Sequence, residues 1–196
     1  MQPHILVILG STRTVRAGEK VTSWLLPIAQ KRTDATYELI DVRALNLPIF
    51  SNPKSPKTIE HAYEDPREQA WVAKVESADG FIIVTPEYNH GYPPALKNAL
   101  DCVYAGWNNK PVAFVSYGGI AAGTRAVQQL RQVVVELQMT PIRNQVAIPF
   151  ISAAFDPDGK PLNAAPLEKS VYAMLDQLSW WANVLKEGRT AHPLPV

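Results

Sequence analysis

Cysteine and net charge are both scarce in this chain of 196 residues. Cys102 is the only cysteine, so neither an intrachain disulfide nor a cysteine-based metal cluster can form. We expect it to be a small packed hydrophobe on a helix. The 19 basic and 18 acidic residues leave a net charge of +1. That balance excludes the broad basic surface of a nucleic-acid binder, and it argues against a highly acidic electron carrier that docks by charge.

Long apolar runs are missing as well. None approaches the roughly 18 residues of a transmembrane helix, and the amino terminus has no secretory-signal pattern. We therefore expect no membrane association and a cytoplasmic location. The hydrophobic share of 46% and the charged share of 19% are typical of a globular protein. The length fits one domain over residues 1–196.

Short apolar runs alternate with helical patterns along the chain. Ile5–Leu9, Phe81–Val84 and Val112–Val115 predict strands buried on both faces. Alternating strands and helices predict a parallel sheet covered on both sides, which is a three-layer, doubly wound α/β domain with five strands. The other predicted elements are strands at 37–42 and 143–148, helices at 16–31 (with Pro27 inside), 63–77, 95–104, 123–139 and 167–186, and loops at 44–57 and 150–161.

In such sheets ligands bind beyond the carboxyl ends of the strands. The first loop, Gly10–Gly18, contains the hydroxyls of Ser11 and Thr12 and the cations Arg13 and Arg16, and it leads into a helix amino terminus. This combination suits a terminal phosphate. It has neither the nucleotide P-loop pattern nor the dinucleotide glycine pattern. A Ser/Thr helix cap followed by two solvated arginines is the alternative interpretation.

Two more unusual loops follow the third and fourth strands. Thr85–Pro94 is rich in proline and aromatic residues, and its exposed N–H groups could bind the edge of a planar heterocycle. A rigid strand-to-helix turn is the alternative. Ser116–Gly123 contains glycines and alanines that allow a ligand to approach the backbone, although it could be only a flexible connection. Together the three loops suit a phosphate-bearing planar ring system.

The same loops resemble the NADPH-dependent FMN reductase family over roughly residues 4–150. The resemblance is carried by Gly10–Arg13, by Thr85–Asn89 with Gly91–Pro93 and Leu96–Ala99, and by Ser116–Gly119. It implies a flavodoxin-like fold with strand order 2-1-3-4-5, bound FMN, and a homodimer or homotetramer with active sites near the subunit interface. The residues that it implies for cofactor binding are Ser11, Arg13, Arg16, Gly18, Pro86, Glu87, Tyr88, Asn89, His90, Ser116, Tyr117, Gly118 and Gly119.

Two positions depart from the family pattern. The chain has Ala121-Ala122-Gly123 where members often have a second Gly-Gly, and Gly18 stands where others often have serine. The first departure affects the start of a helix, and the second removes a hydroxyl donor from the phosphate loop.

The resemblance implies an NAD(P)H oxidoreductase that reduces quinones, azo compounds or free flavin by ping-pong hydride transfer through FMN. No catalytic side chain is required, and backbone N–H groups around Gly118 and Gly119 could stabilise the reduced ring. Trp107 is a candidate to cover the ring from a partner subunit. Arg125 could meet a nucleotide phosphate or be a solvated helix arginine, and Trp180 and Trp181 are candidate core or dimer contacts.

Two other functions share features of this sequence. A non-enzymatic flavin-binding redox sensor or electron carrier remains the alternative, because flavin-binding loops alone do not distinguish it from an enzyme. A phosphoacceptor receiver domain shares the topology, but it requires acidic residues at the ends of strands one and three. Here those ends are Gly10 and Thr85-Pro86.

Overall fold

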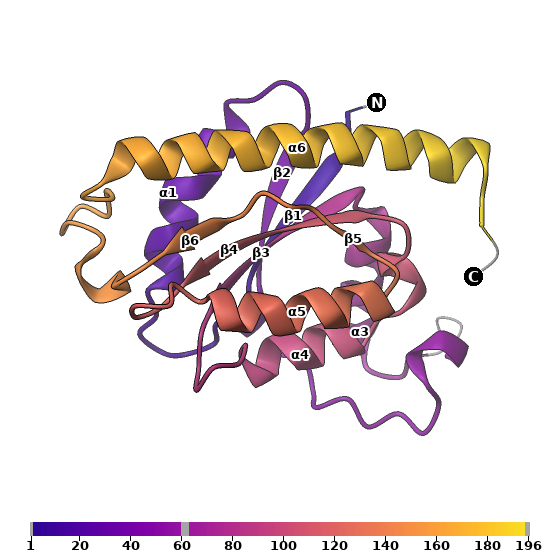
Figure 1. Cartoon of the computed structure of the whole chain (residues 1–196). Helices are drawn as coiled ribbons and strands as arrows, with labels where there is room; N and C mark the ends of the chain where they lie inside the picture. Colours follow the sequence, from indigo (N-terminus) through magenta and orange to yellow (C-terminus); the bar gives the residue numbers. More distant parts are fainter. Residues whose placement is uncertain (1, 60–62, 195–196) are drawn as a thin grey trace.

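Buried apolar runs pair side by side into one parallel sheet in the computed structural model, which describes residues 2–59 and 63–194. The order is β2-β1-β3-β4-β5, and β6 also pairs with β4 (Figure 1). The predicted strand order 2-1-3-4-5 is thus confirmed. The strands are β1 (His4–Leu9), β2 (Thr36–Asp41), β3 (Gly80–Pro86), β4 (Pro111–Tyr117), β5 (Thr140–Pro141) and β6 (Val146–Ile148).

The fifth strand is broken into two pieces, where the sequence predicted one strand over 143–148. β5 pairs with the start of β4 and β6 with its end. In the interruption, the N–H of Asn144 donates to Gln177 Oε1 at 2.8 Å, and the carbonyl of Ile142 accepts from Arg131 at 3.0 Å. Side chains of two helices therefore take backbone groups that would otherwise extend the strand.

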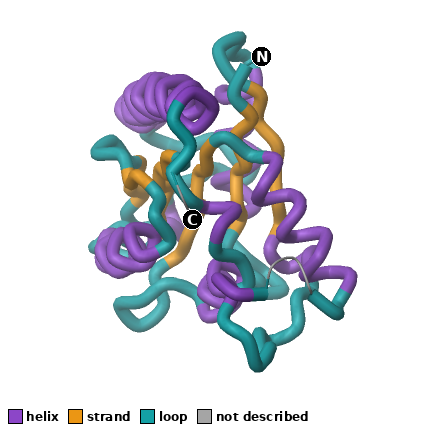
Figure 2. Tube along the Cα trace, turned by 90° about the vertical axis from the view of Figure 1, so that its right-hand side faces the viewer, coloured by secondary structure: helices purple, strands orange, loops and turns teal. Residues whose placement is uncertain are grey.

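Helices cover both faces of the sheet, as Figures 1 and 2 show. The apolar sides of α1 and α6 form one core layer with one face, and those of α3, α4 and α5 form the other. The predicted three-layer architecture is therefore confirmed. The helices are α1 (Gly18–Gln30), α2 (Val42–Leu45), α3 (Pro66–Ser77), α4 (Pro94–Asp101), α5 (Thr124–Glu136) and α6 (Ala164–Ala191), with short 3-10 turns η1 (Pro56–Thr58), η2 (Ala105–Trp107) and η3 (Ile151–Ala153).

Helix ends differ from the predicted ones where capping decides them. α1 begins two residues after Arg16, which leaves that arginine in the loop, and Pro27 does not shorten it. α3 begins at Pro66 because Asp65 caps it by accepting from the Arg67 N–H. The predicted start at 63 is therefore wrong, and residues 60–62 lie outside the described part. In the described part, no helix combines the length and apolarity that crossing a bilayer requires.

Trp107 is a core residue, so the prediction that it covers a ring from a partner subunit is wrong. It is fully buried, its Nε1 donates to the Leu100 carbonyl at 3.1 Å, and its ring meets that of Phe81 at 4.7 Å between centroids.

Cys102 is also buried, and burial raises the pKa of its thiol to about 12. The expectation of a small packed hydrophobe is therefore confirmed.

The β4–α5 connection folds back tightly at Gly123, which has a left-handed φ of +79°. A Cβ there would lie 2.8 Å from the Ser116 Cβ and 2.9 Å from the Tyr117 nitrogen. The glycine therefore meets two needs at once, a conformation that L side chains rarely adopt and a close approach to β4. This contact holds the loop after β4 against the end of its own strand.

Gly159 provides a matched test of that close approach, because its φ is +78° and nothing lies within 4 Å of its Cβ position. We expect Gly159→Ala to lower the free energy of unfolding by about 1 kcal/mol through left-handed strain alone. Gly123→Ala should lower it by about 2–4 kcal/mol, because overpacking adds to the strain. Urea denaturation measures both, and equal losses would contradict the steric argument.

Candidate functional site

The parallel register brings three loops to one edge of the sheet. Leu9 pairs with Val84, and Pro86 pairs with Tyr117. The first backbone groups beyond the strands continue the pairing, since the Gly10 N–H donates to the Val84 carbonyl at 2.9 Å. The loops surround a cavity of about 250 Å³ lined by Ser11, Arg13, Arg16, Ala17, Pro86, Glu87, Tyr88, Tyr117, Gly118, Gly119 and Ile151.

This cavity brings together most of the residues predicted to bind a cofactor. Gly18, Asn89, His90 and Ser116 were predicted too, but they do not line it. Sequence reasoning did not find Ala17 or Ile151. Ile151 follows β6, and no motif in the sequence marks that segment as part of the site. The predicted residues that do line the cavity are Ser11, Arg13, Arg16, Pro86, Glu87, Tyr88, Tyr117, Gly118 and Gly119.

Asn89 and His90 form the exposed tip of a tight turn beside the cavity. The turn is closed from both sides, by the Tyr88 N–H on the Gly91 carbonyl at 2.8 Å and the Gly91 N–H on the Tyr88 carbonyl at 2.9 Å. Both central residues have positive φ, 48° and 69°, as a type I′ turn requires. The predicted rigid backbone is therefore present, but these two side chains lie outside the cavity.

Gly18 and Ser116 do not line the cavity but pack against residues next to it. A Cβ on Gly18 would lie 2.5 Å from both Leu9 Cδ1 and Tyr117 Oη, so the serine that other members often have would require these two side chains to shift. Ser116 is fully buried, and its hydroxyl donates to the Ala122 carbonyl at 2.8 Å. That hydrogen bond directs the hydroxyl into the β4–α5 loop.

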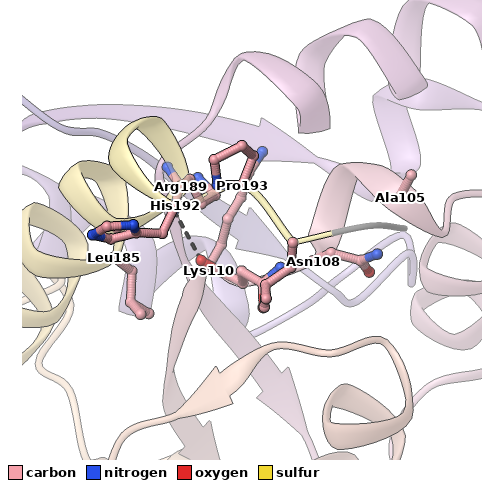
Figure 3. A pocket seen from close by; sticks show the side chains of 10 residues that line it. Ala105, Asn108, Lys110, Leu185, Arg189, His192 and Pro193 are labelled. Carbon is pink, nitrogen blue, oxygen red and sulfur yellow. Dashed lines mark hydrogen bonds between the residues drawn. The ribbon is translucent and has the colours of Figure 1, made fainter.

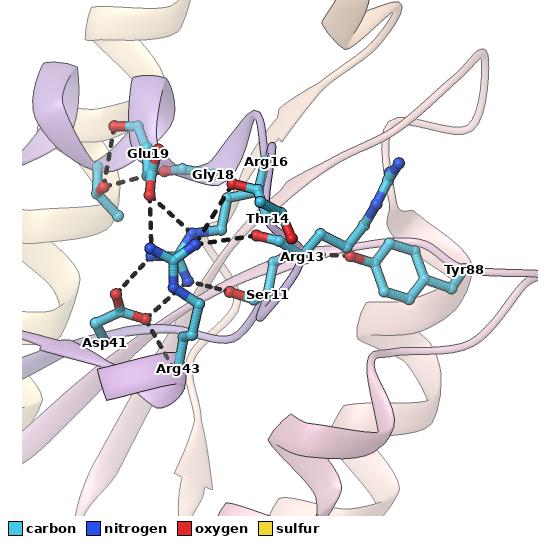
Figure 4. A network of polar contacts seen from close by, with 10 residues as sticks. Ser11, Arg13, Thr14, Arg16, Gly18, Glu19, Asp41, Arg43 and Tyr88 are labelled. Atoms are coloured by element: carbon cyan, nitrogen blue, oxygen red, sulfur yellow. Dashed lines mark hydrogen bonds and ion pairs between the residues drawn. The ribbon is translucent and has the colours of Figure 1, made fainter. Parts of the chain in front are cut away.

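Arg16 lies at the centre of a polar network that shapes the first loop (Figure 4). Its guanidinium donates to Asp41 at 2.8 and 2.5 Å and to Glu19 at 3.0 Å, and it also donates to the Ser11 carbonyl. Only 2% of its side chain is exposed, so the interpretation as a solvated arginine is wrong for this residue. Burial opposes ionisation of Asp41, yet the hydrogen bonds from Arg16 hold the pKa of that carboxyl below its usual value.

Arg13 and Ser11 have opposite exposure in the first loop, since Ser11 is buried. Arg13 is exposed, and Ser11 Oγ shares a hydrogen bond of 2.8 Å with Tyr88 Oη, which joins the first loop to the second. Helix α1 starts behind them with Ala17 at its N-cap and no side-chain cap. The interpretation as a Ser/Thr cap is therefore wrong. An uncapped helix amino terminus beside a cation and a hydroxyl favours an anion.

Tyr117 lines the cavity with a buried side chain, and its hydroxyl lies inward against Gly18. Its side chain is buried, and its hydroxyl has no hydrogen-bond partner within the described part of the chain. Burial raises the pKa of this phenol, so it is a neutral donor. A buried hydroxyl without a partner destabilises a protein by about 1–3 kcal/mol. The hydroxyl is therefore a polar atom at the base of the site that the described chain leaves without a well-formed hydrogen bond.

Glu87 connects the second loop to helix α5. Its carboxylate accepts from Arg125 Nε at 2.6 Å and from the Arg125 backbone N–H at 3.2 Å. Although burial acts against the charge, these bonds lower the pKa of Glu87. Arg125 is therefore an ion-pair partner of the site and not merely a solvated helix arginine.

The third loop is tied to the segment after β6. The Gly118 N–H donates to the Ile148 carbonyl at 3.2 Å, while the carbonyls of Gly118 and Gly119 accept from Ile151 at 2.9 Å and Phe150 at 3.1 Å. The Gly118 N–H is therefore already used, and its predicted role as a donor to the ring is wrong. Of the two predicted donors, Gly119 remains.

A second cavity, of about 420 Å³, lies at the other end of the strands, where β4 begins (Figure 3). It lies between the start of β4 and the end of α6. Lys110 donates there to the carbonyls of Val75 and Glu76 at 2.9 and 3.0 Å, and burial lowers its pKa to about 8. Arg189 pairs with Asp79 at 2.8 Å. Lys110 and Arg189 are thus engaged in bonds within the chain, and no predicted cofactor-binding residue lines this cavity.

Across residues 2–59 and 63–194, no group of His, Cys, Asp and Glu could hold a metal ion.

Comparison with known proteins gives a consistent match. The family model for NADPH-dependent FMN reductases matches residues 3–153. An NAD(P)H-dependent FMN reductase of Schizosaccharomyces pombe is 41% identical over 137 residues, covering 70% of this chain and 68% of that protein. A quinone reductase of Escherichia coli is 31% identical over 144 residues, covering 68% and 70%.

Solved structures show the same fold. A flavoenzyme NAD(P)H:(acceptor) oxidoreductase from Paracoccus denitrificans superposes with a TM-score of 0.66 at 20% identity, covering 94% of this chain and 98% of that one. The structure of RosB with bound 8-demethyl-8-formylriboflavin-5'-phosphate superposes with a TM-score of 0.72 at 16% identity, covering 98% and 82%. The flavodoxin-like fold implied by the three loops is therefore confirmed.

The Arg16–Asp41 pair yields a test of how the first loop is held. Asp41→Asn keeps the cap on α2 but removes the negative charge that pairs with the buried guanidinium of Arg16. The free energy of unfolding at pH 7 should therefore fall by about 2–3 kcal/mol. Because the folded pKa of Asp41 is depressed, its contribution is full above the unfolded value near 4 and is lost as pH falls through the folded value.

Urea denaturation of wild type and Asp41→Asn at pH 7 and pH 3 measures this difference, which should shrink at pH 3. Glu19→Gln is the matched control, since it removes the more exposed partner of the same arginine and should change stability by less than about 1 kcal/mol. A difference between wild type and Asp41→Asn that does not depend on pH would contradict the ion-pair interpretation.

Proposed function

The chain belongs to the NADPH-dependent FMN reductase family, and we propose that it binds FMN in the cavity of about 250 Å³ and uses NADPH or NADH to reduce a small acceptor. Quinones, azo compounds and free flavin are the acceptor classes. The observation that carries the proposal is the convergence of three loops on one cavity, the first of them with the exposed Arg13 and the amino terminus of α1 that no side chain caps.

The phosphate end of FMN would lie against the first loop. Arg13 and the hydroxyl of Ser11 would contact the phosphate, together with the amino terminus of α1. Arg16 would act mainly as a positioning residue, because Asp41 and Glu19 already neutralise its charge and its bond to the Ser11 carbonyl fixes the loop. Gly18 would contribute close packing rather than a donor.

The ring end would lie between the second and third loops. Pro86, Glu87 and Tyr88 would line one side, and Tyr117, Gly118 and Gly119 the other. The Tyr117 hydroxyl would donate to a polar atom of the flavin. Asn89, His90 and Ser116 would act through the backbone shape of the loops that they close.

FMN, when bound, supplies the two-electron chemistry between NAD(P)H and the acceptor. The chain's task is therefore to bind, orient and shield. No acid or base in the cavity is needed for hydride transfer, and Glu87 is held ionised by Arg125. The Glu87–Arg125 pair would hold the second loop at a fixed distance from α5, and so set the width of the ring end.

The matched proteins favour an enzyme over the alternative of a non-enzymatic sensor or carrier, because their names are those of reductases.

A homodimer or homotetramer is part of the proposal. Trp180 is 59% exposed on α6, and Val135 is exposed on α5. Such apolar side chains suit contacts between subunits. The cytoplasm is the proposed location, consistent with a single buried thiol.

Titration and turnover test the proposal directly. The purified apoprotein should bind FMN, and it should bind riboflavin at least about tenfold more weakly because the charge-assisted phosphate contacts are lost. With FMN bound, it should oxidise NADPH or NADH when 1,4-benzoquinone is supplied. Absence of oxidation with both nucleotides would contradict the enzyme, and equal affinity for the two flavins would contradict the phosphate loop.

Tyr117→Phe tests the ring end separately. Removing the hydroxyl should weaken FMN binding by roughly tenfold, the effect of one lost hydrogen bond. It should leave the stability of the apoprotein unchanged or slightly raised, because an unpartnered polar atom disappears. Tyr37→Phe is the matched control, since that buried hydroxyl on β2 also has no partner but lies outside the cavity. Flavin fluorescence quenching measures the affinities, and equal effects in both variants would contradict the assignment.

A further inference from the structure

Phe150 has a backbone conformation that its side chain disfavours. Its φ and ψ are 47° and 49°, in the left-handed region, where a bulky aromatic residue is an outlier. Two hydrogen bonds fix it there, from the Phe150 N–H to the Gly119 carbonyl at 3.1 Å and from the Ile151 N–H to the Gly118 carbonyl at 2.9 Å. A glycine would satisfy the same two bonds without strain.

Packing within the chain does not explain the aromatic side chain, because 59% of Phe150 is exposed. Ile120, the next residue on the loop to which Phe150 is bonded, is 81% exposed. We call these two residues the apolar rim. Both are sequence neighbours of residues that line the cavity, Ile151 and Gly119. A strained, exposed aromatic residue beside a binding cavity indicates a role in contacting a ligand.

We propose that the apolar rim, with Phe150 as its main contact, holds the planar aromatic acceptor against the mouth of the cavity and so favours ring-shaped acceptors over compact inorganic ones. The inference rests on the proposed function. Three observations support it: each rim residue is the sequence neighbour of a residue that lines the cavity, the carbonyls of Gly118 and Gly119 fix the backbone at Phe150, and both exposed side chains are apolar. Aromatic and aliphatic side chains gain from contact with a flat ring and gain little from a hydrated polyanion.

The decisive variant is Phe150→Gly, because it removes the side chain and relieves the strain together. The holoprotein carrying FMN is titrated with 1,4-naphthoquinone in the absence of NAD(P)H, so that binding is measured without turnover. Steady-state KM values are then measured for 1,4-naphthoquinone and for ferricyanide. Urea denaturation of the apoprotein gives the effect on stability.

We expect Phe150→Gly to raise the Kd and the KM for naphthoquinone by roughly five- to tenfold, the size of one lost aromatic contact. The KM for ferricyanide should change by less than about twofold, and the variant should withstand urea at least as well as wild type. Phe150→Ala should bind naphthoquinone as weakly as the glycine variant while being less stable, since alanine keeps the strain. Phe150→Tyr should retain the affinity of wild type.

Gln138→Gly is the matched control for the backbone. Gln138 also has a positive φ, 57°, and lies at the end of α5 outside the cavity. It should gain stability as Phe150→Gly does, with unchanged Kd and KM for naphthoquinone.

Several results would overturn the inference. These are an unchanged naphthoquinone Kd in Phe150→Gly, an equal loss with ferricyanide, no naphthoquinone binding by wild type, or dissociation of an oligomer in gel filtration. The last result would assign the apolar rim to a second copy of the chain. Failure of the wild-type holoprotein to oxidise NAD(P)H with any acceptor would instead overturn the proposed function, so the two failures are distinguishable.

Discussion

The site depends on the parallel register of β1, β3 and β4. Each of these strands is almost wholly buried, so sliding one of them by a residue would exchange its two core faces. The register ends the three strands beside one another, and the loops beyond them are held by the same hydrogen-bond ladder that builds the sheet. The shape of the cavity is therefore set by the hydrophobic core, and the loops need little rigidity of their own.

Charge in the first loop is divided between two arginines with different tasks. Arg16 is buried and neutralised by carboxylates, so it fixes the shape of the loop. Arg13 is exposed and leaves its charge available at the surface of the cavity. In the second loop, the ion pair of Glu87 with Arg125 likewise fixes the position of a residue that lines the cavity. Within the described residues, the proposed binding surface thus combines the exposed Arg13 with backbone groups of the loops, and paired charges lie behind it.

Sequence reasoning predicted the layers and the three loops, because buried apolar runs and glycine- or proline-rich connections are local signals, whereas the strand order was implied by the family resemblance. It did not find the partner of Arg16, since Asp41 lies 25 positions away at the end of another strand. It also missed Ile151, which reaches the cavity through bonds to the third loop, and it misplaced Trp107. In each case the deciding contact joins segments distant in sequence, whereas apolar periodicity reports only on neighbours along the chain.

The broken fifth strand has a consequence for the behaviour of the protein at high concentration. One edge of the sheet offers only the two residues of β5, which include Pro141, and the three of β6. The other edge, β2, carries Glu38 and Asp41, both engaged in ion pairs. One edge is short and contains a proline, and charged side chains lie on the other, so edge-to-edge strand pairing, the route to amyloid-like aggregates, is disfavoured. Copies of the chain that associate would then have to use side chains on the helix faces, which do not template the addition of further strands.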